Sequence, residues 1–367
     1  MIDRIKQYLT ENRRKLSLNS SDLEPLQLFN VNYNFVESYP IISRVVLWFE
    51  PGNSRPSIAT KITDAGLTKN DIEYCTEFQT EINRHLGRDV FLKVLDVFEL
   101  EGSLVIAEEA EANHTYETEL KFAICGPERC HARFERTFTS QMSELGELTA
   151  QLNAMDRGGP LQKWGDKAFE FASRFKNENG FTEADFPEHG LQFMREAINK
   201  LEIRNTPVLA DFVCPNIFPG PRLIDNVHPE LKEWNTELPG IINIFRFIVP
   251  YFYSPPVNLL YPDWSHALAS ALADEREESI IGGPLRGLLV ENGLDPTQQA
   301  DSIWALIQYA AVFEMQDKLL FYQNSPFMLG GKIQTFKEWT QRMCEVSTIE
   351  VNADYLLDCE KNLHNQI

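Results

Sequence analysis

The chain has 367 residues, with 54 acidic against 34 basic side chains and a formal net charge of −20 at pH 7. This acidic balance argues against a nucleic-acid-binding surface, because such surfaces need clustered lysine and arginine. The hydrophobic share of 43% is ordinary for a globular protein, which argues against general disorder, and the length suggests one large domain or two.

The first 110 residues predict a short helix followed by a sheet with one main helix. Ile2, Ile5 and Leu9 recur at helical spacing and predict an amphipathic helix at the start. Runs rich in β-branched and aromatic side chains predict five strands, at residues 26–36, 43–50, 56–62, 90–100 and 103–109. Residues 70–86 predict a helix between the third and fourth strands, with Asn70 as its N-cap. The turns are too short for crossovers, so we expect an antiparallel sheet.

Residues 115–138 predict a further β-hairpin. Leu120, Phe122 and Ile124 alternate along its first arm, as the apolar side chains of a half-buried strand do. Such a hairpin would line an acceptor site, make a dimer contact or decorate the edge of a lobe, and the residues leave these alternatives open.

The remainder of the chain predicts mostly helices, interrupted by two very short strands within residues 208–225. The most apolar stretch, residues 241–253, is shorter than the roughly 20 residues that a bilayer-spanning helix needs, so we expect no membrane contact. The 6 cysteines are scattered over the chain and no secretory signal opens it, so we expect a cytoplasmic protein.

This order of elements predicts an α+β protein of two lobes with a cleft between them. Residues 1–109 are the expected antiparallel-sheet lobe, and residues 110–367 are a larger, mostly helical lobe. Phosphoryl transfer from a nucleotide requires a cation on the phosphates, a partner for that cation, metal ligands and an acid near the acceptor hydroxyl. Candidates for these parts follow one another along the chain: Lys61, Glu81, Asp211, Asn216 and Asp225.

The segments that carry these residues resemble those of a known family. "VLADFVCPNIF" and "PRLIDNV" are similar to the "HGDxxxxN…IDW" segment of the aminoglycoside phosphotransferase and choline kinase group, the small-molecule branch of the protein-kinase-like fold. "SELGELTAQLNAM" resembles the helix that precedes this segment in the family. "PSIATKI" resembles the family's lysine strand and "SLVIAEEA" its hinge strand. The resemblance extends over about residues 30–230.

The resemblance implies that the first lobe binds ATP. Lys61 would contact the phosphates, with Glu81, or else Glu77, as its ion-pair partner. The loop after the first strand lacks glycine, so Ser38 or Ser43 would donate to the phosphates in place of backbone groups. Backbone groups would hydrogen-bond the adenine at Glu108, Glu109 and Ala110.

The resemblance also implies the reacting groups. Asp211 would orient the acceptor hydroxyl or accept its proton, and Asn216 and Asp225 would hold Mg²⁺, which bridges the phosphates. Acids and an aromatic residue of the C-terminal helices would present themselves to a cationic small-molecule acceptor, at Asp263, Trp264 and Glu275. We expect neither nucleic acid nor a membrane as a partner, and a homodimer stays open.

Each candidate also has a structural interpretation. Lys61 would be a charge on an edge strand, and Glu81 one of several acids on an exposed helix. Asp211 and Asn216 would form Asx turns, and Asp225 would cap a turn. The order of the candidates along the chain favours the functional interpretation.

Three departures from the family's pattern bear on whether the site is active. Leu209-Ala210 stands where the family has His-Gly, Asn153 where it has histidine, and Asn226 where it has an aromatic residue. The loop histidine is mainly structural, so its loss weakens the scaffolding rather than deleting the chemistry. The sequence therefore predicts an ATP- and Mg²⁺-dependent phosphotransferase acting on a small-molecule hydroxyl. A pseudokinase or nucleotide-sensing regulator, and transfer of a nucleotidyl group, stay open.

Overall fold

The computed structural model describes residues 1–28, 43–63, 67–111, 113–125, 131–155, 163–210, 212–224, 227–228, 231–253, 268, 271–273, 279–322 and 337. The chain divides into two compact units. Unit 1 comprises Met1–Asn113 and Arg222–Lys232, and unit 2 comprises His114–Pro221 and Glu233–Ile367. The fold is α+β with an antiparallel sheet, as predicted. None of the helices within these ranges combines the length and the apolarity that crossing a bilayer requires.

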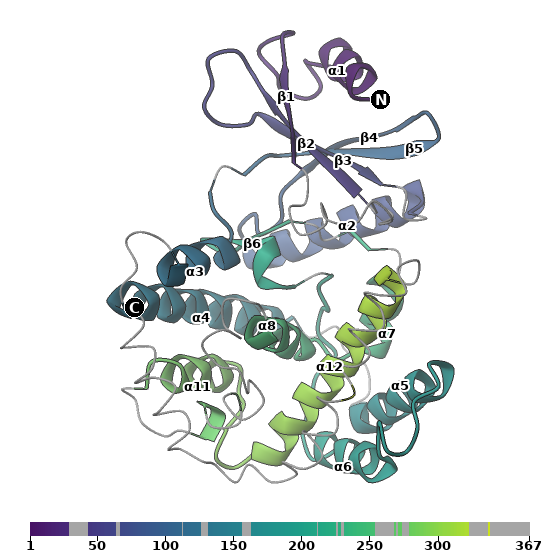
Figure 1. The fold of residues 1–367 in the computed structure, drawn as a ribbon, viewed down its shortest axis with the longest axis vertical. Coiled ribbons are helices and arrows are strands. Elements are labelled where there is room, and N and C mark those ends of the chain that lie inside the picture. The colour runs from purple at the N-terminus through teal and green to yellow at the C-terminus, as the bar shows by residue number, and fades with distance from the viewer. Residues whose placement is uncertain are drawn as a thin grey trace. The chain divides into compact units, whose positions relative to one another are not determined.

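Unit 1 is built around a sheet of five antiparallel strands in the order β1-β2-β3-β5-β4 (Figure 1). The strands are β1 (Glu24–Leu28), β2 (Ser43–Phe49), β3 (Ile58–Thr63), β4 (Val94–Leu100) and β5 (Ser103–Glu108). Helix α1 (Ile2–Glu11) precedes the sheet, and helix α2 (Lys69–Leu86) separates β3 from β4 in the chain. The last four predicted strands, their antiparallel pairing and the main helix are therefore confirmed. Of the strand predicted at residues 26–36, residues 26–28 lie in β1 and the rest lie outside the described residues.

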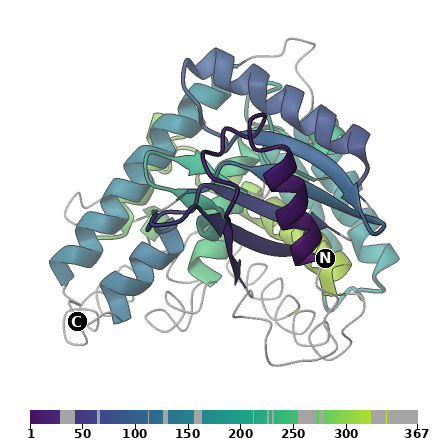
Figure 2. The same cartoon turned by 90° about the horizontal axis from the view of Figure 1, so that it is seen from above.

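One face of this sheet packs against α1, which lies across the strands in Figure 2. Tyr8 of α1 stacks on Phe98 of β4 with the ring centroids 3.7 Å apart. On the same face, the buried indole of Trp48 in β2 donates a hydrogen bond to the hydroxyl of Thr60 in β3 at 2.8 Å. Because side chains alternate between the two faces of a strand, Lys61 points to the face opposite α1.

Helix α2 begins at Lys69, and Thr68 rather than the predicted Asn70 is its N-cap. The N–H of Asp71 donates to the Thr68 hydroxyl at 3.2 Å, and the N–H of Thr68 donates to the Asp71 carboxylate at 2.8 Å. This reciprocal pair is a capping box, which satisfies two backbone donors that the first turn leaves without partners. The Thr68-x-x-Asp71 spacing, rather than Asn70 alone, is thus the signal that defines the start.

Unit 2 is mostly helical (Figure 1). Its helices include α3 (Tyr116–Cys125), α4 (His131–Asn153), α5 (Trp164–Glu178), α6 (Glu188–Ile198), α8 (Ile242–Tyr253), α11 (Gly282–Glu291) and α12 (Ala300–Tyr322). Helix α12 packs on α5, α6 and α8, and α4 packs on α3 and α11. Short elements lie between α6 and α8: the 3-10 turn η2 (Cys214–Asn216), the strands β6 (Ile217–Phe218) and β7 (Arg222–Leu223), and helix α7 (Leu231–Glu237).

The predicted hairpin over residues 115–138 is wrong, because this segment contains α3 and the start of α4. Helix α3 buries Tyr116, Leu120 and Ala123, which are spaced by three or four residues, whereas Phe122 is 41% exposed. In a strand, Leu120 and Phe122 would share one face. The alternation of apolar residues was therefore incidental, and the helical stripe decides the structure.

Helix α4 likewise begins at His131, inside the segment that was predicted as a hairpin. Phe134 and Phe138 are both buried, and their rings stack with the centroids 5.9 Å apart. Met142 continues this spacing of four residues and is buried as well. The two phenylalanines, read as part of a strand in the sequence, thus belong to the apolar stripe of a long helix.

Candidate functional site

Lys61 lies at the centre of the sheet in unit 1. Strand β3 is the middle strand, and Lys61 is opposite Val45 of β2 on one side and Ile106 of β5 on the other. This position excludes the interpretation of Lys61 as a charge on an edge strand. The Lys61 ammonium is half-buried and has therefore lost part of its hydration. A bound anion close to it would compensate for that loss.

Glu108 at the end of β5 shares the sheet face of Lys61. It is opposite Ala59, two residues before Lys61, so the two side chains are diagonal neighbours on adjacent strands. Burial raises the pKa of the Glu108 carboxyl, and the positive charge of Lys61 opposes that rise. Glu108, predicted to act only through its backbone, is therefore also an electrostatic partner of Lys61.

The acids predicted to pair with Lys61 occupy exposed positions of α2. Glu81 and Glu77 are both exposed, and no ion pair joins either carboxylate to Lys61, although the structure describes all three side chains. The polar residue that α2 buries is Gln79, which is 6% exposed. Gln79 lies one turn after Cys75 in the apolar stripe of the helix, and this position could have identified it from the sequence as a buried residue.

The segment predicted to bind the adenine follows β5. The N–H of Glu109 donates to the carbonyl of Lys93 at 2.9 Å, so it is already engaged. Within the described residues, nothing bonds the backbone N–H of Ala110 or the carbonyl of Glu109. Among the described residues, one donor and one acceptor are therefore left for a base.

The guanidinium of Arg222 in β7 contacts both acids beside Ala110. It donates to Glu111 at 3.0 Å and to Glu109 at 3.1 Å. The backbone of β7 is fixed as well, because the N–H of Leu223 donates to the carbonyl of Val90 at 2.7 Å. Strand β7 thus belongs to unit 1 and leads toward Asp225, which lies outside the described residues.

In unit 2, two asparagine amides hold the backbone just before Asp211. Asn243 of α8 accepts from the N–H of Leu209 at 2.9 Å and donates to the carbonyl of Pro207 at 2.9 Å. Asn235 of α7 accepts from the N–H of Val208 at 3.0 Å and donates to its carbonyl at 3.2 Å. The backbone of residues 207–209 is therefore fixed by side chains, as buried polar groups outside regular structure require.

Arg246 of α8 supplies the next contact along this segment. Its side chain is 2% exposed and donates to the carbonyl of Leu209 at 2.6 Å and to the carboxylate of Glu314 at 2.8 Å. The guanidinium carbon lies 4.6 Å from the ring centroid of Phe313 and 5.4 Å from that of Trp234. A buried charge needs such partners, so Arg246 and Glu314 together form a charged anchor for the chain at Leu209.

Asn153 and Asn216 are described and have structural neighbours. The amide of Asn153 donates to Asn292 at 2.9 Å and accepts from the Thr206 hydroxyl at 3.4 Å, so it holds the start of the same segment. Asn216 ends η2, where its N–H donates to the carbonyl of Val213 at 2.9 Å, and its side chain is half-buried. Its amide oxygen is a ligand type that suits Mg²⁺.

Several predicted residues lie outside the described part of the chain or have side chains outside it. Those outside it altogether are Ser38, Asp211, Asp225, Asp263, Trp264 and Glu275. Ser43 is the first residue of β2 and is opposite Thr63 of β3, but its side chain is outside the described set. Their predicted roles stay predictions.

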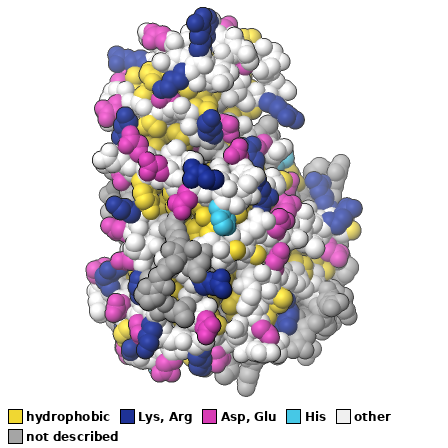
Figure 3. Space-filling view, turned by 180° about the vertical axis from the view of Figure 1, so that it is seen from behind, with side chains coloured by type: hydrophobic (Ala, Val, Ile, Leu, Met, Phe, Trp, Pro, Cys, Tyr) yellow, Lys and Arg dark blue, Asp and Glu magenta, His cyan; other side chains and the backbone are white. Residues whose placement is uncertain are grey.

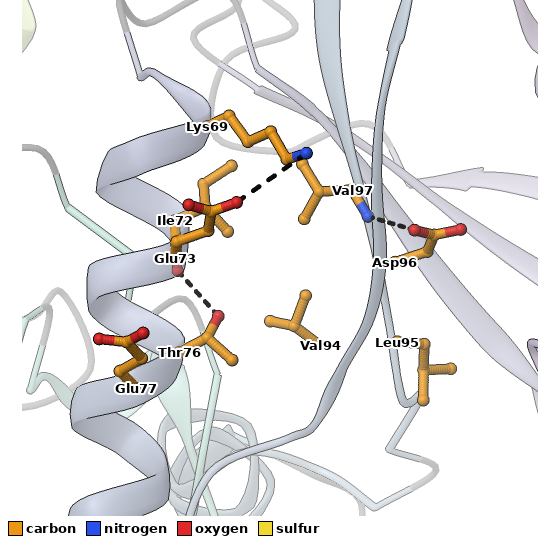
Figure 4. A pocket seen from close by; sticks show the side chains of 9 residues that line it. All are labelled: Lys69, Ile72, Glu73, Thr76, Glu77, Val94, Leu95, Asp96 and Val97. Carbon is orange, nitrogen blue, oxygen red and sulfur yellow. Dashed lines mark hydrogen bonds and ion pairs between the residues drawn. The ribbon is translucent and has the colours of Figure 1, made fainter.

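A pocket of about 330 Å³ lies between α2 and β4 in unit 1 (Figure 4). Ile72 of α2 and Val94 of β4 contribute apolar side chains, while Glu73 and Glu77 contribute carboxylates from the helix (Figure 4). Asp96 adds a third carboxylate to the lining, against the single ammonium of Lys69, which pairs with Glu73 at 3.9 Å. This excess of negative charge would repel a polyphosphate, so the pocket does not suit the phosphates of a nucleotide. Acidic and basic side chains are interspersed over the face drawn in Figure 3, so surface charge singles out no site there.

A metal site made only of histidine, cysteine, aspartate and glutamate does not occur within the described ranges. The thiols of Cys75 and Cys214 are buried, and burial raises the pKa of both, which keeps them in the protonated form that binds metals poorly.

No model of a known protein family matches the chain. A search of curated proteins found no match either.

Proposed function

We propose that the chain is an ATP- and Mg²⁺-dependent phosphotransferase with a protein-kinase-like fold, acting on a hydroxyl of a small molecule. The observation that supports it most is the place of Lys61. It is a half-buried cation at the centre of an antiparallel sheet, on the face opposite α1 and beside Glu108. Phosphoryl transfer needs a fixed cation on the nucleotide phosphates, and the end of β5 offers a base one donor and one acceptor nearby.

In this proposal the 207–210 segment positions the acceptor. Asn235, Asn243 and Arg246 fix its backbone up to Leu209, two residues before Asp211. Asp211 would then orient the acceptor hydroxyl and take its proton as the phosphoryl group is transferred. The departure from His-Gly to Leu209-Ala210 therefore leaves a scaffolded backbone, with amide and guanidinium groups as its supports.

Asn216 and Asp225 would bind the metal in this proposal, each through an oxygen atom. A Mg²⁺ ion held there would neutralise charge on the phosphates. The net charge of −20 favours a cationic acceptor, whose approach an acidic protein accelerates. Transfer of a nucleotidyl group instead would use the same nucleotide-binding residues.

A nucleotide-binding regulator without transferase activity is the second candidate. One observation favours it: Glu81 and Glu77 are exposed and make no ion pair with Lys61 within the described structure. In protein kinases such a pair must be in place for activity. Glu108 offers a substitute acid on the face of Lys61, which is why we favour the enzyme.

A transfer assay separates the two candidates. The purified protein is incubated with radiolabelled Mg²⁺-ATP and a panel of hydroxylated amines, sugars and peptides, and labelled product is measured. We expect transfer by the wild type and by Asp22→Asn, a control at an exposed carboxylate, but none by Asp211→Asn. Nucleotide binding without transfer to any acceptor supports the regulator. Absence of binding to any nucleotide contradicts both candidates.

A further inference from the structure

Arg222 forms the main charged contact between β7 and the segment after β5. Its two terminal nitrogens bind different acids, Glu111 at 3.0 Å and Glu109 at 3.1 Å. The side chain of Glu111 is only 11% exposed, so this arm of the contact is largely desolvated. A planar guanidinium that binds two carboxylates at once fixes the positions of both and compensates their negative charge.

The contact fixes the backbone on both sides of Ala110. Glu109 is bound at three points, because its carboxylate also accepts from the N–H of Lys93 at 3.3 Å and its own N–H donates to the Lys93 carbonyl. Glu111 is held by Arg222 from the other side. Without the guanidinium, two carboxylates two residues apart would repel each other and widen the range of backbone conformations at Ala110.

The backbone next to Arg222 is held in place by hydrogen bonds. Leu223, the next residue, pairs with the strand-like segment at Phe91 in a parallel bridge. Its N–H donates to Val90, and its carbonyl accepts from the N–H of Leu92 at 3.1 Å. Because this backbone is already ordered, the Arg222 side chain loses less conformational entropy when it binds Glu109 and Glu111. The contact can therefore restrain residues 109–111 effectively.

We propose that Arg222 is a positioning residue that holds residues 109–111 in the conformation that receives the base of a purine nucleotide. This inference rests on the proposed nucleotide site and assigns to it a residue that touches neither base nor phosphate. Its signature is a loss of affinity for the base itself. A nucleoside without phosphates must therefore be affected as much as the triphosphate.

Isothermal titration of the whole chain with adenosine and with Mg²⁺-ATP tests this. We expect Arg222→Gln to weaken both ligands by the same factor, about three- to tenfold, the range for losing a partly exposed ion-pair network near a binding site. Arg222→Lys keeps the positive charge but not the two-pronged guanidinium, so its affinity for both ligands should lie between those of the wild type and Arg222→Gln. Arg4→Gln removes another ion pair of unit 1, at 3.0 Å to Glu101, and should bind like the wild type. Lys61→Met should weaken ATP and spare adenosine.

A second variant guards against a folding artefact. Glu111→Gln removes the negative charge from one arm of the contact with almost no change of size, and thermal unfolding without ligand checks that each variant is folded. We expect Glu111→Gln and Arg222→Gln to be non-additive in the double variant, because they break the same contact.

Three outcomes overturn the inference. Arg222→Gln that binds adenosine like the wild type shows that the contact does not position the base site. A loss confined to ATP shows that Arg222 acts on the phosphates instead. If the wild type binds neither adenosine nor ATP, the nucleotide site itself is absent, and the proposed function falls together with the role of Arg222.

Discussion

The guanidinium of Arg246 donates a hydrogen bond to the backbone carbonyl of Leu209 at 2.6 Å. Leu209 stands two residues before Asp211, the proposed catalytic base, and together with Ala210 it occupies the two positions where the resembling family has His-Gly. The same guanidinium binds Glu314 of α12, so an ion pair between helices supports the loop at this point. The working geometry of the loop therefore depends on a residue 37 positions away in the chain.

Removing this anchor should be costly. Arg246→Met leaves the Glu314 carboxylate buried without its partner, and we expect the free energy of unfolding to fall by roughly 3–5 kcal/mol. The double variant Arg246→Met, Glu314→Leu should recover most of that stability, because apolar side chains of similar volume replace the pair. Urea unfolding measures both.

Activity distinguishes positioning from stability in the same variants. We expect the double variant to transfer phosphate slowly despite its recovered stability, since the Leu209 carbonyl has lost its donor. A stable double variant with an unchanged kcat would show that Arg246 supports the fold alone.

The Asn243 amide gives a second test of the same segment. Asn243→Ala leaves the Leu209 N–H and the Pro207 carbonyl without partners in a buried place, at a cost of about 1–3 kcal/mol for each group. Asn179→Ala, at an exposed residue with one hydrogen bond to Phe175, is the matched control and should cost under about 1 kcal/mol. Equal stability of the two variants, measured by urea unfolding, would contradict the account of the segment.

The sheet of unit 1 could be predicted because its information is local. Alternating β-branched and aromatic residues define each strand, and short turns such as Glu101-Gly102, both with positive φ, require antiparallel pairing. The central position of Lys61 could not be predicted in this way. It depends on β5 pairing between β3 and β4, which is a property of the sheet and not of any one strand.

The helices of residues 116–153 show where a local pattern misleads. Leu120 and Phe122 suggest a strand, but the structure buries the first and exposes the second. We expect Leu120→Ala to cost about 2–5 kcal/mol and Phe122→Ala less than about 1 kcal/mol. A hairpin would make the two substitutions similarly costly, so comparable values in a denaturation experiment would contradict the helix.

Glu50 gives unit 1 a pH-dependent contribution to stability. Burial raises the pKa of its carboxyl, but hydrogen bonds from the backbone N–H groups of Ser20 and Asn19, at 2.6 and 2.5 Å, and from the hydroxyl of Ser57 outweigh it and hold the pKa below its ordinary value of 4.5. A depressed pKa stabilises the fold above the unfolded-state value, and this contribution is lost as the pH falls through the folded-state pKa.

The corresponding substitution is Glu50→Gln. At pH 7 we expect it to lower the free energy of unfolding by about 1.5–3 kcal/mol, the range for hydrogen bonds to a charged group. Below pH 4.5 the unfolded-state carboxyl takes up a proton, so the difference between variant and wild type should begin to shrink, and it should be lost as the pH falls through the lower pKa of the folded-state carboxyl. A difference that is constant in urea unfolding from neutral to acid pH would contradict this assignment.

The sequence alone could point to some residues of the candidate site but not to the residues that support them. Lys61 and the segment before Asp211 carry local signals, such as a lysine in an apolar strand and a carboxylate after an apolar run. The supports came from far along the chain: Asn243 and Glu314 bind or stabilise a segment that ends at residue 210. Arg222 and Glu111, 111 residues apart, show the same limit. Pairings across such distances have no local pattern in a single sequence.

Binding of Mg²⁺-ATP is the measurement that tests the central claim most directly. Isothermal titration compares the wild type with Lys61→Met and with Lys69→Met, a matched control at an exposed lysine of α2. We predict that the wild type binds, that Lys69→Met binds equally well, and that Lys61→Met loses about 10- to 100-fold in affinity, as expected when a charged hydrogen bond to phosphate is removed. A wild type that binds no nucleotide, or a Lys61→Met variant that binds as tightly as the wild type, would contradict the account.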